Sequence, residues 1–134
     1  NMAKKEKEEI TIVEQQLCKE YADPKELYLP NGKADDFAKK FSEISNRQLR
    51  KVLNNVKLAL RLNRDSFEKA RKQMFILVAM GAYDAGRNGD LAILYEFLKS
   101  MINENSIQTE EDIKTFDRLF TSIVAYHRIE GGKE

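Results

Sequence analysis

From residue 33 onward, apolar residues recur every three or four positions along the chain, which is the spacing of one helix face. Residues 46–63 show this most clearly, with a single apolar side made of Leu49, Val52, Leu53, Val56 and Leu60. Similar patterns predict helices over residues 35–44, 67–85, 90–103 and 109–129. Since no segment keeps the two-residue alternation of a strand, the pattern predicts an all-α fold, an irregular bundle of five or six helices.

Capping signals mark where these helices begin. Ser45 is followed three residues later by Gln48, which is the spacing of a capping box. Thr109 with Asp112, preceded by Ile107 and followed by Ile113, has the features of an N-cap and a hydrophobic staple. Asp65 or Ser66 is placed to cap the helix that follows. Within that helix, residues 74–82 are apolar on nearly all sides, and we therefore predict a central helix that is covered on several sides.

The clearest break in the chain lies between residues 23 and 32, which contain both prolines and a Pro-Asn-Gly turn signal. Before the break, residues 4–21 predict a charged amphipathic helix with Ile10, Val13, Leu17 and Tyr21 at helical spacing. We expect one domain over residues 1–134, with a helical core over 35–130. Residues 1–34 form an N-terminal helix and a hinge, and the charged tip indicates a mobile helix or one exchanged between copies.

Composition limits the possible functions. The chain has 134 residues, of which 34% are charged, but its formal net charge is only +1. No apolar run is long enough to cross a membrane, and the single cysteine, Cys18, fits a reducing environment. We therefore expect a cytoplasmic protein without membrane contact.

The positive charge is nonetheless segregated. Residues 45–73 contain nine Lys or Arg against two acidic residues. On the helix predicted over residues 46–63, and just beyond its end, mostly basic side chains lie within an arc of about 140° around the helix axis. They form a row about 25 Å long. This basic row consists of Arg47, Arg50, Lys51, Asn54, Lys57, Arg61 and Arg64.

No acidic residue interrupts the basic row before Asp65, so no ion pair within the helix neutralises it. One interpretation is a solvated helix face. The other is a binding surface for a phosphate backbone, which predicts salt-dependent RNA binding without reading of the base sequence. An alternative function is a helical protein–protein adaptor whose basic row meets an acidic partner. Leu58 and Leu62, near the polar side of the same helix, are either ordinary exposed leucines or a subunit contact.

No catalytic or metal-binding pattern is present. His127 is the only histidine and Cys18 the only cysteine, whereas a zinc site needs three or four ligands. The common nucleophile, metal and phosphate-loop motifs are absent. We therefore predict a protein without enzymatic activity, metal or cofactor.

Three stretches together resemble one known family. They are residues 46–57 (NRQLRKVLNNVK), 81–87 (GAYDAGR) and 123–133 (IVAYHRIEGGK). In this order they are similar to the small subunit of the type III-A CRISPR effector, the Csm complex, over roughly residues 35–133. The resemblance implies an all-helical, non-catalytic subunit in antiviral defence, of which several copies stack along a guide RNA–target RNA duplex.

The resemblance also implies partners and contact residues. The partners are guide RNA, target RNA, the backbone and large subunits of the Csm complex, and further copies of the chain. In isolation the chain is expected to dimerise, with a helix exchanged across the hinge at residues 24–32. The resemblance implies that the basic row contacts RNA phosphates, and Arg87 is a further candidate for an RNA contact. His127 is either packed in the core or, like Lys133, a contact to RNA or a neighbouring subunit.

Overall fold

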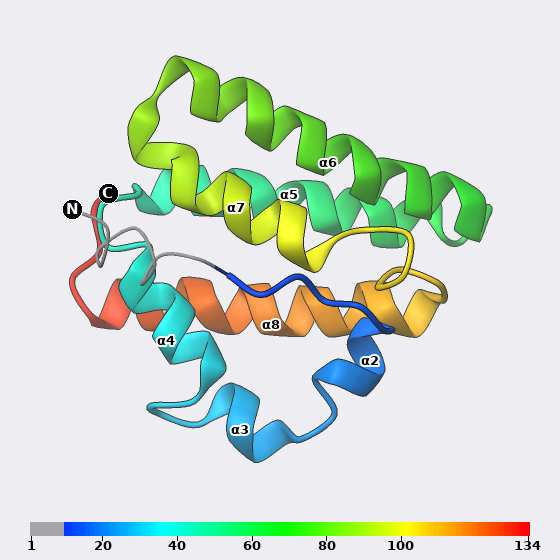
Figure 1. Ribbon diagram of the computed structural model, residues 1–134, viewed down its shortest axis with the longest axis horizontal. Helices are drawn as coiled ribbons and strands as arrows, with labels where there is room; N and C mark the ends of the chain where they lie inside the picture. The colour runs from blue at the N-terminus through cyan, green and yellow to red at the C-terminus, as the bar shows by residue number, and fades with distance from the viewer. Residues whose placement is uncertain (1–9) are drawn as a thin grey trace.

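The computed structural model describes residues 10–134, and these form an all-α bundle, as predicted (Figure 1). The described part of the chain contains no strand. Its elements are α2 (Leu17–Glu20), α3 (Pro24–Tyr28), α4 (Lys33–Lys40), α5 (Asn46–Leu62), α6 (Phe67–Arg87), the 3₁₀ helix η1 (Gly89–Leu91), α7 (Ala92–Met101) and α8 (Glu110–Ile129).

Helix α8 is the centre of the bundle. It buries residues along its whole length, from Asp112 to His127. Figure 1 shows α5 and α6 on one side of α8 and α3 and α4 on the other. Within this core, the Phe97 ring of α7 lies 4.9 to 6.0 Å from four other phenylalanine rings, measured between centroids. These rings come from α4, α8 and the residue that follows α4, so one aromatic cluster joins three helices.

The predicted central position of the 67–85 helix is wrong. Helix α6 packs against α5 and α7 along one side, and its fully buried residues are Ala70, Met74 and Leu77. On its outer side, Ile76 is 41% exposed and Tyr83 is 67% exposed. Residues 74–82 are apolar on nearly all sides, but within residues 10–134 no helix packs against the outer side of α6 (Figure 1).

The predicted N-terminal helix over residues 4–21 is also wrong within the described range, and residues 4–9 lie outside it. Only Leu17–Glu20 is helical. Residues 10–16 run along α7 without helical structure, and the Val13 amide donates to the Ser100 carbonyl oxygen at 2.9 Å. The run Ile10-Thr-Ile-Val13 is rich in β-branched residues, which favour extended backbone. Burial of Val13 and Leu17 accounts for the apolar positions that suggested a helix.

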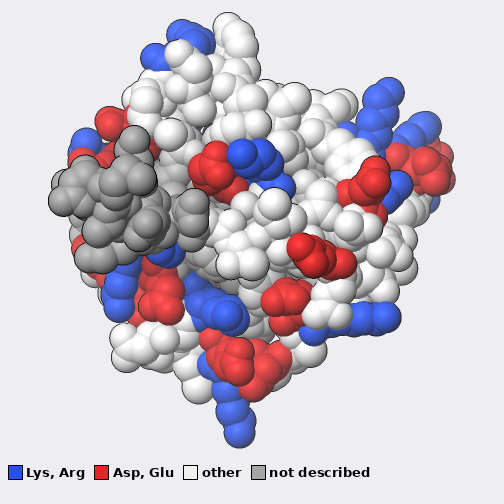
Figure 2. Space-filling model, in the orientation of Figure 1, with Lys and Arg blue, Asp and Glu red and all other residues white. Residues whose placement is uncertain are grey.

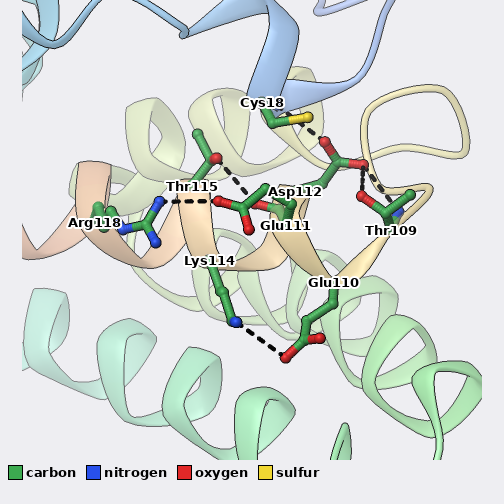
Figure 3. A network of polar contacts seen from close by, with 8 residues as sticks. All are labelled: Cys18, Thr109, Glu110, Glu111, Asp112, Lys114, Thr115 and Arg118. Atoms are coloured by element: carbon green, nitrogen blue, oxygen red, sulfur yellow. Dashed lines mark hydrogen bonds and ion pairs between the residues drawn. The ribbon is translucent and has the colours of Figure 1, made fainter.

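One carboxylate fastens this N-terminal segment to α8. The buried side chain of Asp112 accepts hydrogen bonds from the Cys18 amide at 3.0 Å and from the Gln16 side chain at 3.0 Å. It also accepts from the amides of Gln108 and Thr109, each at 2.9 Å. Figure 3 shows Cys18 and Thr109 converging on Asp112 from two sides. The predicted N-cap at Thr109 is confirmed, and Asp112 completes a capping box there while also binding the distant N-terminal segment.

The break at residues 23–32 contains a short helix that the sequence pattern did not predict. Asp23 caps α3 by accepting from the Lys25 amide at 3.0 Å, and Pro24 occupies the first helical position, where its missing N–H costs nothing. The predicted turn at residues 30–32 is confirmed, with Asn31 in the left-handed region at φ 69°. The next helix, predicted over 35–44, begins and ends earlier, as Lys33–Lys40.

Candidate nucleic-acid interface

Helix α5 forms where its sequence predicts. The Ser45 hydroxyl accepts a hydrogen bond from the Gln48 amide at 3.1 Å and caps the first turn. Leu49, Val52 and Val56 are buried against the core, with Leu53 and Leu60 partly buried beside them. The apolar side of α5 therefore anchors the helix between α6 and α8 and directs the opposite side to solvent.

All seven members of the basic row are exposed, from Arg47 at the start of α5 to Arg64 just beyond its end. The placement agrees with the prediction of one outward face. Leu58 and Leu62, at the edge of this face, are half-buried. The structure thus presents the row to solvent without a protein segment over it in the described part of the chain.

Two lysines of the row are neutralised by partners that helical spacing did not reveal. The Lys51 Nζ lies 3.1 Å from Asp84 on α6, and the Lys57 Nζ lies 2.8 Å from Asp117 on α8. These carboxylates come from other helices, so a search for acidic residues three or four positions away misses them. Lys51 and Lys57 occupy opposite edges of the row and connect α5 to the helix on each side.

The arginines of the row behave differently. Among residues 10–134, the side chains of Arg47, Arg50, Arg61 and Arg64 make neither an ion pair nor a hydrogen bond. Arg50 and Arg61 lie eleven positions apart, which separates their Cα atoms by about 16 Å along the helix. The positive charge that remains available on α5 is therefore carried by guanidinium groups, which bind phosphate oxygens through two parallel hydrogen bonds.

The remaining candidates lie apart from α5 or are occupied. Arg87 is exposed at the end of α6, where its guanidinium carbon lies 5.7 Å from the Tyr83 ring centroid. Lys133 is exposed and its Nζ lies 3.5 Å from Glu43.

His127 is packed in the core. It is 1% exposed, and its Nε2 lies 2.8 Å from the Ile44 carbonyl oxygen, which assigns a proton to that nitrogen. Gly132 lies directly over the ring: a Cβ there would fall 2.2 Å from the His127 Cε1. Of the two interpretations given above for His127, this placement agrees with the packed histidine, and the ring offers no surface to a partner.

The charges of the described residues are mixed on another part of the surface. On the face turned toward the viewer in Figure 2, basic and acidic side chains are intermixed. At the start of α8, Glu110 lies 3.3 Å from Lys114 and Glu111 lies 3.2 Å from Arg118 (Figure 3). Within residues 10–134 no group of three or more His, Cys, Asp or Glu is placed to hold a metal ion, and no helix has the length and apolarity to cross a membrane.

These features define a small all-α protein in which one helix presents a face of unpaired arginines. The family model described as Csm2 Type III-A matches residues 24–133, most of the chain. The chain therefore belongs to the Csm2 type III-A family and is a small subunit of the type III-A Csm CRISPR complex. That membership places it in a complex with other Csm subunits, in a family of structural, generally non-catalytic small subunits. Neither the curated proteins nor the solved structures that were compared with the chain gave a match.

Proposed function

We propose that this chain is a non-catalytic RNA-binding subunit that steadies a guide RNA–target RNA duplex through the exposed arginines of α5. The observation that carries the proposal is the contrast within the basic row: its two paired lysines are engaged by Asp84 and Asp117, whereas its four arginines have no partner among the described residues. Unpaired like charges on one helix face destabilise the helix slightly. A polyanionic backbone would relieve this repulsion and release its own counterions.

The proposed contact is to phosphates and not to base edges. The row contains no aromatic residue and only one amide side chain, Asn54. In a guide–target duplex the base sequence is already read by base pairing, so a structural subunit needs only the regular backbone. We therefore propose sequence-tolerant binding in which Arg47, Arg50, Arg61 and Arg64 make the main contacts.

Salt dependence gives a quantitative test. With the value of about −0.9 per contact for a double helix, four phosphate contacts predict a slope of about −3.6 in a plot of log affinity against log salt. Raising the salt concentration fourfold should then weaken binding of the duplex about 150-fold. A slope near zero would refute phosphate binding by this face.

Charge reversal locates the contact. Arg50→Glu with Arg61→Glu should abolish RNA binding at moderate salt and leave the helical content unchanged, because both side chains are exposed and unpaired. The matched control is Lys19→Glu with Lys25→Glu, which changes net charge equally at exposed positions on α2 and α3. If both double variants lose binding equally, the effect is one of net charge and the α5 interface is wrong. If neither does, the alternative of an adaptor for an acidic protein gains support.

We also propose that several copies stack along the duplex and that isolated chains associate, as the family resemblance implies. The residues suggested for this contact from the sequence are the N-terminal segment and the half-buried Leu58 and Leu62. In the structure, residues 10–21 pack against α7 and α8 of their own chain. Sedimentation over a range of concentrations tests self-association, and a strict monomer at every concentration, alone and with RNA, would contradict it.

A further inference from the structure

An exposed aromatic residue, Tyr83, lies near the end of α6, which packs against α5, the helix that carries the arginines. Helices α5 and α6 are antiparallel, so the start of α5 and the end of α6 lie at the same end of the molecule (Figure 1). The ion pair between Lys51 and Asp84, at 3.1 Å, fixes this register. Tyr83 is the chain neighbour of Asp84, and Arg87 follows one turn later.

The environment of Tyr83 suits a planar ligand. Its side chain is 67% exposed and does not belong to the hydrophobic core. The Arg87 guanidinium carbon lies 5.7 Å from the ring centroid, within the range of a cation–π contact. Neither group takes part in an ion pair within the described residues.

Two glycines leave space beside this ring. Gly86 lies three residues after Tyr83, on the same side of the helix, and Gly89 begins η1. A Cβ at either position would meet nothing within 4 Å. The two glycines therefore add no side chain to the surface near the end of α6.

We infer that Tyr83, with Arg87 beside it, is a stacking platform for one unpaired nucleobase of an RNA whose backbone lies on the arginines of α5. This inference rests on the proposed function and adds a subsite to it. A ring beside cationic side chains is how proteins hold single-stranded nucleic acid without reading its sequence, because every base has a π-face. Stacking requires an unpaired or displaced nucleotide, so the platform distinguishes such a strand from a continuous duplex.

The test compares two RNA probes that carry the same phosphates. One is a short oligoadenylate and the other an abasic oligoribonucleotide of equal length, each titrated against the full chain. The wild-type protein should bind the oligoadenylate more tightly, by roughly 5- to 150-fold for a single stacked base. Tyr83→Ala should remove this difference by weakening oligoadenylate binding alone, whereas Tyr83→Phe, which keeps the ring, should preserve it.

The outcomes separate the inference from the proposed function. Binding to neither probe refutes the platform, and if an RNA duplex of the same length also fails to bind, phosphate binding by α5 is refuted with it. Binding to both probes with equal affinity by the wild-type protein, or an equal loss for both probes in Tyr83→Ala, refutes the platform and leaves phosphate binding intact. Ile129→Ala, at another exposed apolar position (82% exposed), controls for general loss of apolar surface. If Tyr83→Ala changes sedimentation but not RNA binding, the ring belongs to a protein contact and the inference is wrong.

Discussion

Replacing Asp112 with asparagine is expected to lower the free energy of unfolding at pH 7 by about 2–3 kcal/mol. The wild-type carboxylate is fully buried and accepts hydrogen bonds from Gln16, Cys18, Gln108 and Thr109. Each hydrogen bond to a charged group stabilises the folded state by about 1.5–3 kcal/mol. Asparagine keeps one acceptor oxygen, but its NH₂ group would face N–H donors, so the variant loses more than the charge.

The pH dependence separates charge from packing. Burial alone would raise the pKa of Asp112, but the donors from Cys18, Gln16 and Gln108 outweigh it and lower the pKa from its ordinary 3.8 to about 2. Because the folded value is depressed, this stabilisation is fully present above about pH 4 and is lost as the pH falls toward 2. A shift of this size corresponds to about 2 kcal/mol. The wild-type advantage over Asp112→Asn should therefore shrink by about that amount across this interval.

Urea denaturation followed by far-UV circular dichroism, repeated at pH 7, 5, 4 and 3, measures this difference at every pH where both chains fold. Other carboxylates titrate in both proteins and cancel in the comparison. The control is Glu110→Gln in the same first turn of α8, where an exposed pair with Lys114 predicts a loss of no more than about 1 kcal/mol. A difference between wild type and Asp112→Asn that is constant from pH 7 to 3 would refute the ionic explanation.

Three further changes test the core and its margins. Phe97→Ala should cost about 3–5 kcal/mol in urea denaturation, because the ring joins α7 to α4 and α8; a loss below about 1 kcal/mol would contradict that role. Gly132→Ala should lower the free energy of unfolding by about 1–3 kcal/mol, since the new Cβ would overlap the His127 ring. An unchanged melting temperature would show that the segment around Gly132 shifts away from the ring without cost. Burial and the Asp112 carboxylate raise the pKa of the Cys18 thiol, so a thiol reagent at pH 7 should label it faster in Asp112→Asn than in wild type; equal rates would exclude this coupling.

Helical periodicity predicts the elements whose partners are local. In α5 the apolar side, the Ser45 cap and the exposure of the basic row all follow from spacing within one segment, and the structure agrees with each. The same holds at the start of α8, where Thr109 and Asp112 are three residues apart. Where the stabilising contacts are within a turn or two, the order of residues contains the information that determines the structure.

Elements whose structure depends on distant partners were predicted less well. Residues 10–16 have apolar positions at helical spacing, yet their backbone pairs with Ser100 and Asn103 in the loop and helix far along the chain. Helix α6 was expected to be central because its residues are apolar on all sides, but burial also needs neighbours, and α5 and α7 cover only one side. Tertiary contacts overrode local pattern in both places.

Within the basic row, the lysines and the arginines differ in their partners. Lysine is a compact charge on a flexible stem, and Lys51 and Lys57 each reach a single carboxylate on a neighbouring helix. Arginine presents a planar fork that matches phosphate, and the four arginines of the row are exposed, two before Lys51 and two after Lys57. The ion pairs therefore connect α5 to α6 and α8 and leave the arginines on its exposed side. If this division is correct, exchanging Arg50 and Arg61 for lysine should weaken RNA binding without changing stability, while Lys51→Arg should preserve both.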